Sequence, residues 1–367
     1  MQQKDHIKYM KRALELARLG SGHVHPNPMV GAVIVKNGKI IGEGYHEFFG
    51  GPHAEINAIS HATEDVKGST IYVTLEPCSH YGKTPPCADR IIKEGFEKVV
   101  IGMGDPNPFV NGKGIDKLKK AGIAVTDNVL KENAKHLNEC YLKNIHKKEP
   151  FCVMKTAMTL DGKISTFTGD SKWISSVKSR LYVQELRHRY TGIMVGVNTV
   201  IKDDPKLNDR SENKIKSDPT RIVIDSSGRT PMEAQVLTDD IQTIIAVTNN
   251  APPTFIETVI KKGKEIVICP EKDDKVDLKY LMKVLFEKGI DSILLEGGST
   301  LNFTAIKEGI VDKVISFISP KIVGGKDALT PVGGYGIENI RNAITLNIES
   351  VTKIDDDILV EAYIIHK

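Results

Sequence analysis

The chain has 367 residues, of which 40% are hydrophobic and 26% charged, and its formal net charge is +3. This length favours two domains over a single core, and the composition indicates a globular protein. No apolar run approaches the ~18 residues of a membrane helix, and the small charge gives no support to a nucleic-acid surface, so we expect neither a membrane nor a nucleic-acid partner. Five cysteines indicate a reducing compartment, and without a signal-peptide pattern we expect a cytoplasmic protein.

The first half of the chain predicts strands that alternate with helices. Apolar residues at helical spacing predict a first helix over residues 7–17, and Asn37-Gly38 marks the turn of a hairpin. The strands expected in this half are 30–35, 40–45, 70–75, 98–102 and 123–126. The further helices are expected just after Pro52, from 85 to 95, over 114–121 and over 128–145. Such an alternation implies a sheet covered by helices.

Three residues of metal-ligand type occur at positions that this layout can bring together. His53 precedes Glu55 by two positions, and Cys78 follows a proline, as in the H-x-E…P-C-x-x-C pattern of zinc deaminases. The second cysteine departs from that pattern, because eight residues separate Cys78 from Cys87 instead of two. Two of these ligands lie at expected helix starts and one at a strand end, so they can meet at one edge of the sheet. We therefore predict a catalytic zinc bound by His53, Cys78 and Cys87, with Glu55 as the group that moves protons.

Two other interpretations of this cluster stay open at this point. A structural zinc site would have four protein ligands, and His80, which lies between the two cysteines, could supply the fourth. The same residues could also bind no metal. The glutamate beside the histidine favours the catalytic site, because neither alternative needs a proton carrier there.

The second half begins after a charged, proline-ended linker at residues 146–150, which predicts one domain over 1–147 and another over 148–367. Ser175 or Ser176 can cap a helix that continues to about residue 188. The strands expected here are 151–158, 192–197, 221–225, 243–248, 265–269, 292–295, 311–318 and 358–365, and a further helix is expected over 277–288.

Two segments between these elements have a composition that is often functional. The polar stretch over 208–219 predicts a long loop. The turn Glu296-Gly297-Gly298 leads into a helix near Ser299, where backbone amides could approach a phosphate. It is not the glycine fingerprint of dinucleotide-binding folds, so this turn alone does not identify a cofactor.

Longer motifs in both halves resemble a known family. They are Asn27-Pro28-Met29-Val30-Gly31, His53-Ala54-Glu55, the run from Glu76 to Cys87, Lys155-Thr156-Ala157-Met158-Thr159-Leu160-Asp161-Gly162, Ser171-Lys172-Trp173-Ile174, Asp203-Asp204-Pro205 and Leu294-Leu295-Glu296-Gly297-Gly298. Together they resemble the bifunctional riboflavin-biosynthesis deaminase/reductases, a family that has the long gap between the cysteines. The resemblance covers nearly the whole chain.

The resemblance implies an α/β protein with an N-terminal cytidine-deaminase-like αβα domain and a C-terminal dihydrofolate-reductase-like α/β domain. It also implies a small phosphorylated pyrimidine substrate, zinc and NADPH as cofactors, and two reactions. The first would be hydrolytic deamination of 2,5-diamino-6-(5-phosphoribosylamino)pyrimidin-4-one. The second would be NADPH-dependent reduction of the ribosyl to the ribityl side chain.

Site residues follow from the same resemblance by motif position. The expected substrate contacts of the deaminase are Asn27, His46, Lys83, Asp105 and Asn107. The expected cofactor contacts of the reductase are Met158, Trp173, Thr199, Asp203, Ser226 and Gly298. Its expected substrate contacts are Ser171, Arg187, Leu207, Arg210 and Glu296. The residue types suit these roles, because arginine binds phosphate in a bidentate way and amides and carboxylates recognise a polar ring.

Two rival functions stay open at this stage, and we expect the protein to be a homo-oligomer under any of them. One rival is another zinc-dependent deaminase, acting on nucleosides or an RNA base. The other is a non-catalytic, zinc-stapled protein that senses a nucleotide. Turnover of free cytidine or tRNA would favour the first rival, and zinc binding without turnover in the presence of NADPH would favour the second.

Overall fold

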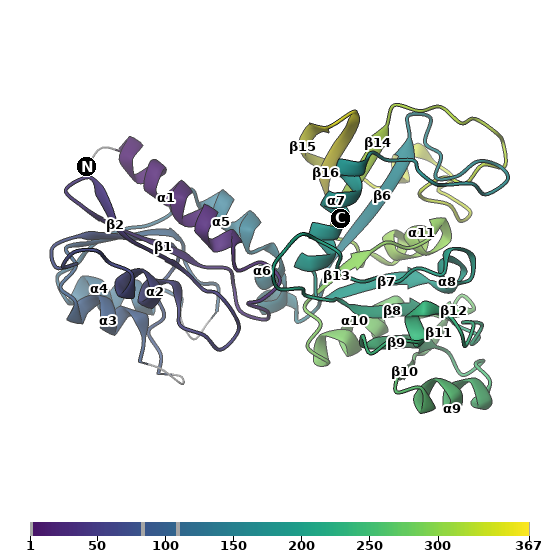
Figure 1. The fold of residues 1–367 in the computed structure, drawn as a ribbon, viewed down its shortest axis with the longest axis horizontal. Helices are drawn as coiled ribbons and strands as arrows, with labels where there is room; N and C mark the ends of the chain where they lie inside the picture. The colour runs from purple at the N-terminus through teal and green to yellow at the C-terminus, as the bar shows by residue number, and fades with distance from the viewer. Residues whose placement is uncertain (1–2, 82–84, 108–110, 367) are drawn as a thin grey trace. The chain divides into compact units, whose positions relative to one another are not determined.

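The computed structural model describes residues 3–81, 85–107 and 111–366. The chain divides into two compact units, Met1–Lys148 and Glu149–Lys367, each with its own sheet (Figure 1). No helix in the described part of the chain is both long enough and apolar enough to cross a membrane.

The first unit is built on a sheet with the strand order β2-β1-β3-β4-β5. Its strands are β1 (Gly31–Lys36), β2 (Lys39–Tyr45), β3 (Thr70–Leu75), β4 (Lys98–Met103) and β5 (Ala124–Thr126). Strand β1 pairs antiparallel with β2 and β3, whereas β3, β4 and β5 run parallel. Asn37 and Gly38 have φ values of 50° and 77°, as both central residues of a type I′ hairpin turn require, which explains the predicted hairpin.

Helices cover both faces of this sheet. They are α1 (Gln3–Arg18), α2 (Ala54–Ser60), α3 (Cys87–Lys93), α4 (Lys113–Lys120), α5 (Lys131–Leu137) and α6 (Glu139–Lys147). Because successive strand residues point to opposite faces, Ile71 and Val73 pack in one core with α2, α3 and α4, whereas Tyr72 packs in the other with α1 and α5. The first unit is therefore a three-layer α/β/α sandwich (Figure 1).

The prediction of one continuous helix over 128–145 was wrong, because two helices lie there. The helical stretch is interrupted at Asn138, whose φ and ψ of −108° and 27° separate α5 from α6. The Asn138 amide accepts a hydrogen bond from the Met29 N–H at 2.8 Å and donates to the Met29 carbonyl at 3.0 Å. This contact with a segment more than a hundred residues earlier is not visible in the local sequence pattern.

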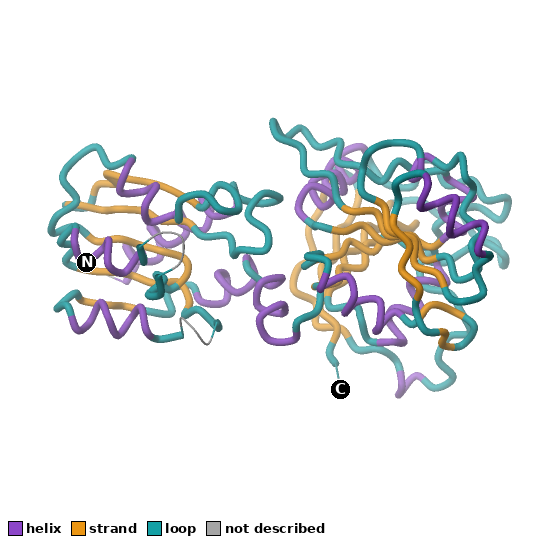
Figure 2. Tube along the Cα trace, turned by 90° about the horizontal axis from the view of Figure 1, so that it is seen from below, coloured by secondary structure: helices purple, strands orange, loops and turns teal. Residues whose placement is uncertain are grey.

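The second unit contains a sheet with the order β10-β9-β8-β7-β13-β6-β14-β16-β15. Its strands are β6 (Phe151–Thr159), β7 (Gly192–Gly196), β8 (Thr220–Ile224), β9 (Thr243–Val247), β10 (Glu265–Ile268), β13 (Ser292–Leu295), β14 (Lys313–Ser319), β15 (Leu346–Ile354) and β16 (Asp357–Ile364), and a separate hairpin joins β11 (Glu271–Lys272) to β12 (Lys275–Val276). Every pairing from β10 to β14 is parallel, and β16 and β15 add an antiparallel edge. Figure 2 shows how strongly this sheet twists.

Helices also cover the second sheet. They are α7 (Val177–Arg189), α8 (Val197–Asp203), α9 (Pro253–Lys261), α10 (Leu278–Glu287) and α11 (Ser299–Glu308), with short 3-10 helices at Gln235–Leu237 and Ile340–Asn342. Ser176 caps α7 as predicted, because its side chain accepts from the Ser179 N–H. In the described residues, α10 and α11 contribute to one core, and α8 and α9 contribute to the other.

The α8 helix was not predicted from the sequence, because Val197 was expected at the end of a strand. The β-branched residues Val197, Thr199 and Val200 favour a strand locally. In the structure, Val197 and Val200 are three positions apart on one helical face and both pack in the core with β7 and β8. The α9 helix, the β11–β12 hairpin and β15 were also not predicted.

Candidate active sites

Three side chains at the ends of elements form a metal-ligand cluster in the first unit. His53 is the N-cap of α2, Cys78 follows the end of β3, and Cys87 is the first residue of α3. Their ligand atoms all lie within 4.8 Å of one another. His53 Nδ1 lies 3.2 Å from Cys87 Sγ and 3.6 Å from Cys78 Sγ, distances shorter than twice the ~2.0–2.3 Å bonds that zinc forms to nitrogen and sulfur. The donor set and its spacing therefore fit zinc.

Hydrogen bonds shift the pKa values of the two cysteines in opposite directions. The Cys87 thiol, backed by His53, lowers the pKa of Cys78 to about 4, and the Cys87 backbone N–H also donates to Cys78 Sγ at 3.2 Å. The neighbouring Cys78 thiolate raises the pKa of Cys87, and its hydrogen bond raises the pKa of His53 to about 9. A thiolate is the form of cysteine that binds a metal.

Glu55 lies in the first turn of α2, two positions after His53, and is only 3% exposed. Burial raises the pKa of its carboxyl group, which also lies within hydrogen-bonding reach of the Cys87 thiol. His80, by contrast, is exposed and does not belong to the ligand cluster among the described residues. The described geometry therefore has three protein ligands with a buried carboxyl group beside them, as in catalytic zinc sites.

The expected substrate residues of the first unit lie in two pairs. Asn27 Nδ2 lies 3.2 Å from His46 Nε2, and the His46 and His53 rings are nearly perpendicular with their centroids 5.7 Å apart. Asp105 is buried and accepts from the Asn107 backbone N–H at 2.9 Å. Lys83 lies outside the described residues.

Two residues that the sequence analysis did not single out support Asp105. The Tyr141 hydroxyl, from α6, donates to its carboxylate at 2.9 Å. The buried Glu76 carboxylate accepts backbone N–H groups from Asp105 and from three residues at the start of α4 and just before it, which are Gly112, Gly114 and Ile115. The only signal in the sequence was the position of Glu76 two residues before a metal-ligating cysteine.

The expected reductase residues gather at the carboxyl ends of parallel strands. Thr199 and Asp203 lie in α8 after β7, Ser226 follows β8, Glu296 and Gly298 follow β13, and Met158 lies near the end of β6. In open parallel sheets, this edge is where ligands bind.

A buried cluster of opposite charges occupies the centre of this edge. Arg187, near the end of α7, donates to both oxygens of Glu296, from Nε at 2.8 Å and from Nη2 at 3.0 Å. Lys155 Nζ, on β6, lies 3.4 Å from the same carboxylate. Burial alone would raise the pKa of Glu296, but the charges of Arg187 and Lys155 prevail and lower it to about 2. Two of the predicted substrate contacts are thus directly paired, and the cluster keeps an excess of positive charge.

The remaining substrate candidates differ in exposure. Arg210 is exposed, and its Nη1 donates to Asn208 Oδ1 at 2.7 Å. Burial and the charge of Arg187 lower the pKa of Arg210, so the two guanidinium groups are in electrostatic reach of each other. Leu207 as a whole is only 2% exposed and packs in the core, so little of this residue is open to a ligand. Ser171 is partly exposed.

The cofactor candidates include a pair around the glycine turn. A methyl group at Gly298 would lie 3.4 Å from Thr199 Oγ1, so the missing side chain leaves the backbone open beside the start of α11. Next to this turn, Asn302 Oδ1 is buried without a hydrogen-bond partner among the described residues. The open backbone at Gly298 fits a phosphate-bearing cofactor such as NADPH. The Asn302 amide oxygen is a hydrogen-bond acceptor, so it suits a donor group of a ligand and not its phosphate.

The other cofactor candidates are held in different ways. Trp173 is 63% exposed, with the Arg180 guanidinium 4.5 Å from its ring centroid, and its carbonyl accepts from Lys321 Nζ at 2.6 Å. The Ser226 hydroxyl accepts from the Val276 N–H at 3.1 Å. Asp203 is exposed at the end of α8, and Met158 is partly buried.

Comparisons with known proteins agree with this geometry. Residues 150–360 match the family described as RibD C-terminal domain, and residues 3–103 match the cytidine and deoxycytidylate deaminase zinc-binding region. The riboflavin biosynthesis protein RibD of Actinobacillus pleuropneumoniae is 48% identical over 361 residues, which cover 98% of this chain and 95% of that protein. RibD of Escherichia coli strain K12 is 39% identical, with coverage of 95% and 97%.

Solved structures give the same result. The diaminohydroxyphosphoribosylaminopyrimidine deaminase/5-amino-6-(5-phosphoribosylamino)uracil reductase of Thermotoga maritima is 39% identical and superposes with a TM-score of 0.87, covering 99% of each chain. RibD of Acinetobacter baumannii is 34% identical and has the same TM-score, with 100% of each chain covered.

The folds and sites of the two units define a two-domain α/β enzyme in which a zinc-dependent, cytidine-deaminase-like domain precedes an NADPH-dependent, dihydrofolate-reductase-like domain. The full-length identity is more specific. The chain belongs to the RibD family of bifunctional deaminase/reductases in riboflavin biosynthesis, which confirms the family, the fold class and both cofactors predicted from the sequence.

Proposed function

We propose that residues 1–147 remove an amino group of 2,5-diamino-6-(5-phosphoribosylamino)pyrimidin-4-one as ammonia, and that residues 148–367 then reduce its ribosyl side chain to ribityl. The observation that carries the first step is the cluster of His53, Cys78 and Cys87 with Glu55 buried beside it. The names of the similar Thermotoga maritima enzyme support the substrate and the order of the two steps.

In the first step, zinc bound by the three ligands would act as a Lewis acid that makes water reactive near neutral pH. The Glu55 carboxylate accepts a proton as water attacks the amino-bearing ring carbon, and it returns that proton to the departing amine. The carbon–nitrogen bond breaks and ammonia leaves. Asn27, His46, Asp105 and Asn107 hold the pyrimidine and its side chain, and we assign Lys83 to the same task from its place in the motif.

In the second step, bound NADPH would supply a hydride to the sugar carbon that is attached to nitrogen and would leave as NADP⁺. The bond from that carbon to the ring oxygen breaks, and the freed oxygen takes up a proton from water, which gives the open ribityl chain. Thr199, Ser226 and Gly298, with Met158, Trp173 and Asp203, would contact the cofactor. The positive charges around Glu296 suit a phosphorylated substrate, and Arg210 is the exposed guanidinium among them. Ser171 and Leu207 would complete the substrate contacts.

Removal of zinc tests whether deamination depends on the metal while reduction does not. A chelator should abolish ammonia release from the diaminopyrimidinone, whereas NADPH oxidation with the already deaminated substrate should continue at a similar rate. Zinc added back should restore ammonia release, with magnesium as the matched control. Equal loss of both activities, or deamination that persists in metal-free protein, would contradict the proposal.

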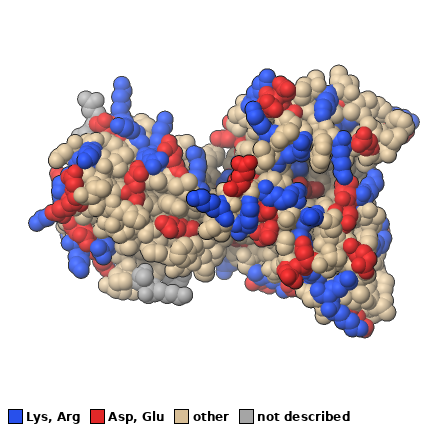
Figure 3. Space-filling view, viewed as in Figure 1, with Lys and Arg blue, Asp and Glu red and all other residues tan. Residues whose placement is uncertain are grey.

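We also infer that the protein is a cytoplasmic homo-oligomer without a nucleic-acid partner. Strand β15 is an edge strand with exposed apolar side chains, among them Ile348 at 61% and Val351 at 60%. On the face drawn in Figure 3, lysine and arginine alternate with acidic side chains, and the net charge is small. Five free cysteines suit a reducing compartment. Light scattering that gives the mass of one chain would contradict the oligomer.

A further inference from the structure

Two consecutive residues in the last turn of α7 bind different parts of the reductase site. Arg187 binds the Glu296 carboxylate after β13. His188 binds the Asp209 carboxylate, with 2.9 Å between His188 Nδ1 and Asp209 Oδ2. The His188 and Asp209 side chains are 6% and 0% exposed, so this second pair is as buried as the first.

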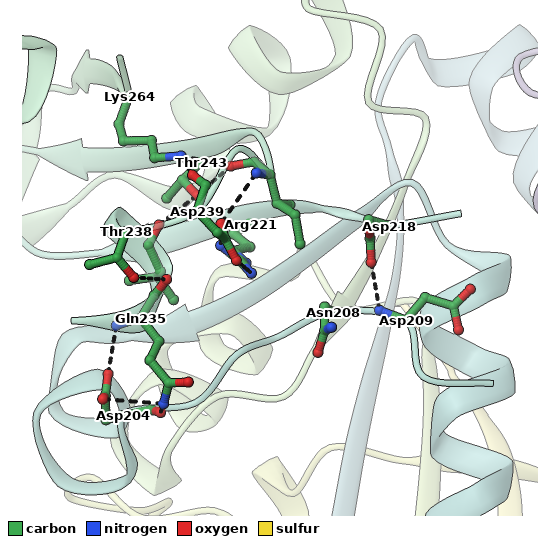
Figure 4. Close-up of polar contacts among 12 residues, drawn as sticks. Asp204, Asn208, Asp209, Asp218, Arg221, Gln235, Thr238, Asp239, Thr243 and Lys264 are labelled. Atoms are coloured by element: carbon green, nitrogen blue, oxygen red, sulfur yellow. Dashed lines mark hydrogen bonds and ion pairs between the residues drawn. The ribbon is translucent and has the colours of Figure 1, made fainter. Parts of the chain in front are cut away.

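The Asp209 carboxylate organises the loop that follows α8. Besides the histidine, it accepts the Ser211 N–H at 2.7 Å and the Ser217 N–H at 3.1 Å. The Asp209 N–H in turn donates to Asp218 Oδ1 at 2.8 Å, a contact drawn in Figure 4 beside Asn208. This buried carboxylate therefore fixes the backbone at Ser211 and Ser217, two places within the polar stretch predicted as a long loop.

Arg210 is the next residue after this anchor and is itself exposed. Its backbone N–H donates to Gln184 Oε1 on α7 at 3.0 Å, and its guanidinium donates to Asn208 Oδ1. The loop is thus attached to α7 at the adjacent residues Asp209 and Arg210, by His188 and Gln184, and again at Asn213, whose Nδ2 donates to Glu185 Oε2 at 2.9 Å. Because Arg187 on the same helix turn binds Glu296, α7 links the exposed arginine to the central charge cluster.

We propose that His188 and Asp209 form a positioning pair that holds Arg210 where its guanidinium binds the phosphate of the reductase substrate. This inference rests on the proposed function, which assigns Arg210 to that substrate. Neither member of the pair touches the substrate. Holding the arginine in place before binding reduces the ordering that substrate binding has to impose on a long, flexible side chain and its loop.

The pair can be tested by separating the hydrogen bond from the bulk of the side chain. His188→Leu removes the donor but fills a similar volume, whereas His188→Asn places an amide N–H near the position of the ring Nδ1. In the full-length protein, His188→Leu should raise the KM for the deaminated pyrimidine phosphate about tenfold, as expected for a lost hydrogen bond to a charged group. His188→Asn should recover most of that loss.

Dependence on Arg210 is tested by a double-mutant cycle. Arg210→Met alone should also raise the KM, and adding His188→Leu to it should change the KM by less than about twofold, because the histidine acts only through that arginine. NADPH affinity, measured by fluorescence titration, and deamination should match the wild type in all variants. These two readouts report that each unit is folded.

Each outcome decides between the inference and the function on which it rests. An unchanged KM in Arg210→Met would reject the phosphate assignment of the proposed function, and the pair would have no substrate role. A raised KM in Arg210→Met with an unchanged KM in His188→Leu would overturn the positioning pair alone. Additive effects, a failure of His188→Asn to rescue, or lost NADPH binding in His188→Leu would show general support of the fold and would likewise overturn the pair.

Discussion

At the residue scale, the deaminase account depends on a single carboxyl group. Glu55 is buried in the first turn of α2, beside the three residues of the metal-ligand cluster. Because only one residue separates it from His53 in the chain, its position is fixed relative to that cluster. A glutamine at this position has nearly the same shape but cannot take up and return a proton. The substitution therefore separates proton transfer from metal binding.

Glu55→Gln should lower the deamination kcat by a factor of about 10²–10⁴, the usual contribution of a positioned acid–base group. Its zinc content and its NADPH-dependent reduction of the deaminated substrate should remain at wild-type levels. Ammonia release, metal analysis and NADPH absorbance measure the three quantities. The matched control is Glu64→Gln on the surface, which should change none of them, and wild-type deamination in Glu55→Gln would remove this residue from the mechanism.

The buried charge cluster around Glu296 is expected to stabilise the second unit in a way that depends on pH. The pKa of Glu296 is lowered to about 2, so its contribution to stability is present above the ordinary carboxyl pKa and is lost as pH falls through about 2. Arg187→Met removes the bidentate partner and leaves a buried carboxylate with Lys155 alone. This change should destabilise the second unit at neutral pH by about 3 kcal/mol.

Urea unfolding followed by tryptophan fluorescence measures that loss, because Trp173 is the only tryptophan and lies in the second unit. Lys178→Met on the same helix is the control. Its ion pair with Asp355 is on the surface, and its removal should cost less than about 1 kcal/mol. If both variants unfold at the same urea concentration, the buried charge cluster does not have the energetic role described here.

At the element scale, the described residues at both ends of the connection between β4 and α4 are held by one side chain that follows β3. The four N–H groups that Glu76 accepts include that of Asp105, an expected substrate contact, and those of Gly112, Gly114 and Ile115 near the start of α4. Glu76 therefore holds Asp105 and the start of α4 in addition to the hydrogen bonds that the described loop residues make among themselves.

Glu76→Gln replaces one acceptor oxygen with a donor that faces N–H groups, so it should loosen this loop. Amide hydrogen exchange at Gly112, Gly114 and Ile115 should accelerate at least about tenfold, corresponding to a loss of 1–3 kcal/mol from an unsatisfied buried group. The KM for deamination should rise while zinc content stays constant. The control is Glu94→Gln at the C-cap of α3, where the side chain pairs with the nearby Arg90. Unchanged exchange in Glu76→Gln would refute the anchor.

Elements with a strong local pattern were predictable from the sequence. The strands at 70–75 and 292–295 have the predicted bounds, because each is a short apolar run ended by a proline or glycine signal. The break at Asn138 was not predictable, since it arises from hydrogen bonds to Met29. Nor was α8, because its β-branched residues favour a strand until tertiary packing places them on one helical face.

The same distinction applies to the sites. His53, Cys78 and Cys87 carry their chemistry in their residue types and spacing, so the cluster could be predicted, and the structure brings their ligand atoms together. Tyr141 and Asp209 are ordinary in sequence and gain their importance from partners far along the chain. Only a structure can show that a tyrosine on α6 binds Asp105.

At the scale of the whole molecule, two separately packed units argue for two chemically independent steps. Each unit has its own sheet with helices on both faces, and the zinc ligands and the cluster around Glu296 lie in different units. The product of the first step is the substrate of the second in the proposed function. The order of the steps is therefore the central claim, and it concerns the entire chain.

The most direct test is to incubate the purified, zinc-loaded protein with the diaminopyrimidinone ribosylamino phosphate, with and without NADPH, and to follow product mass. We expect replacement of one amino group by oxygen without the cofactor, and addition of two hydrogens only when NADPH is also present. A product that gains two hydrogens while keeping both amino groups, or no change in mass at all, would contradict the account.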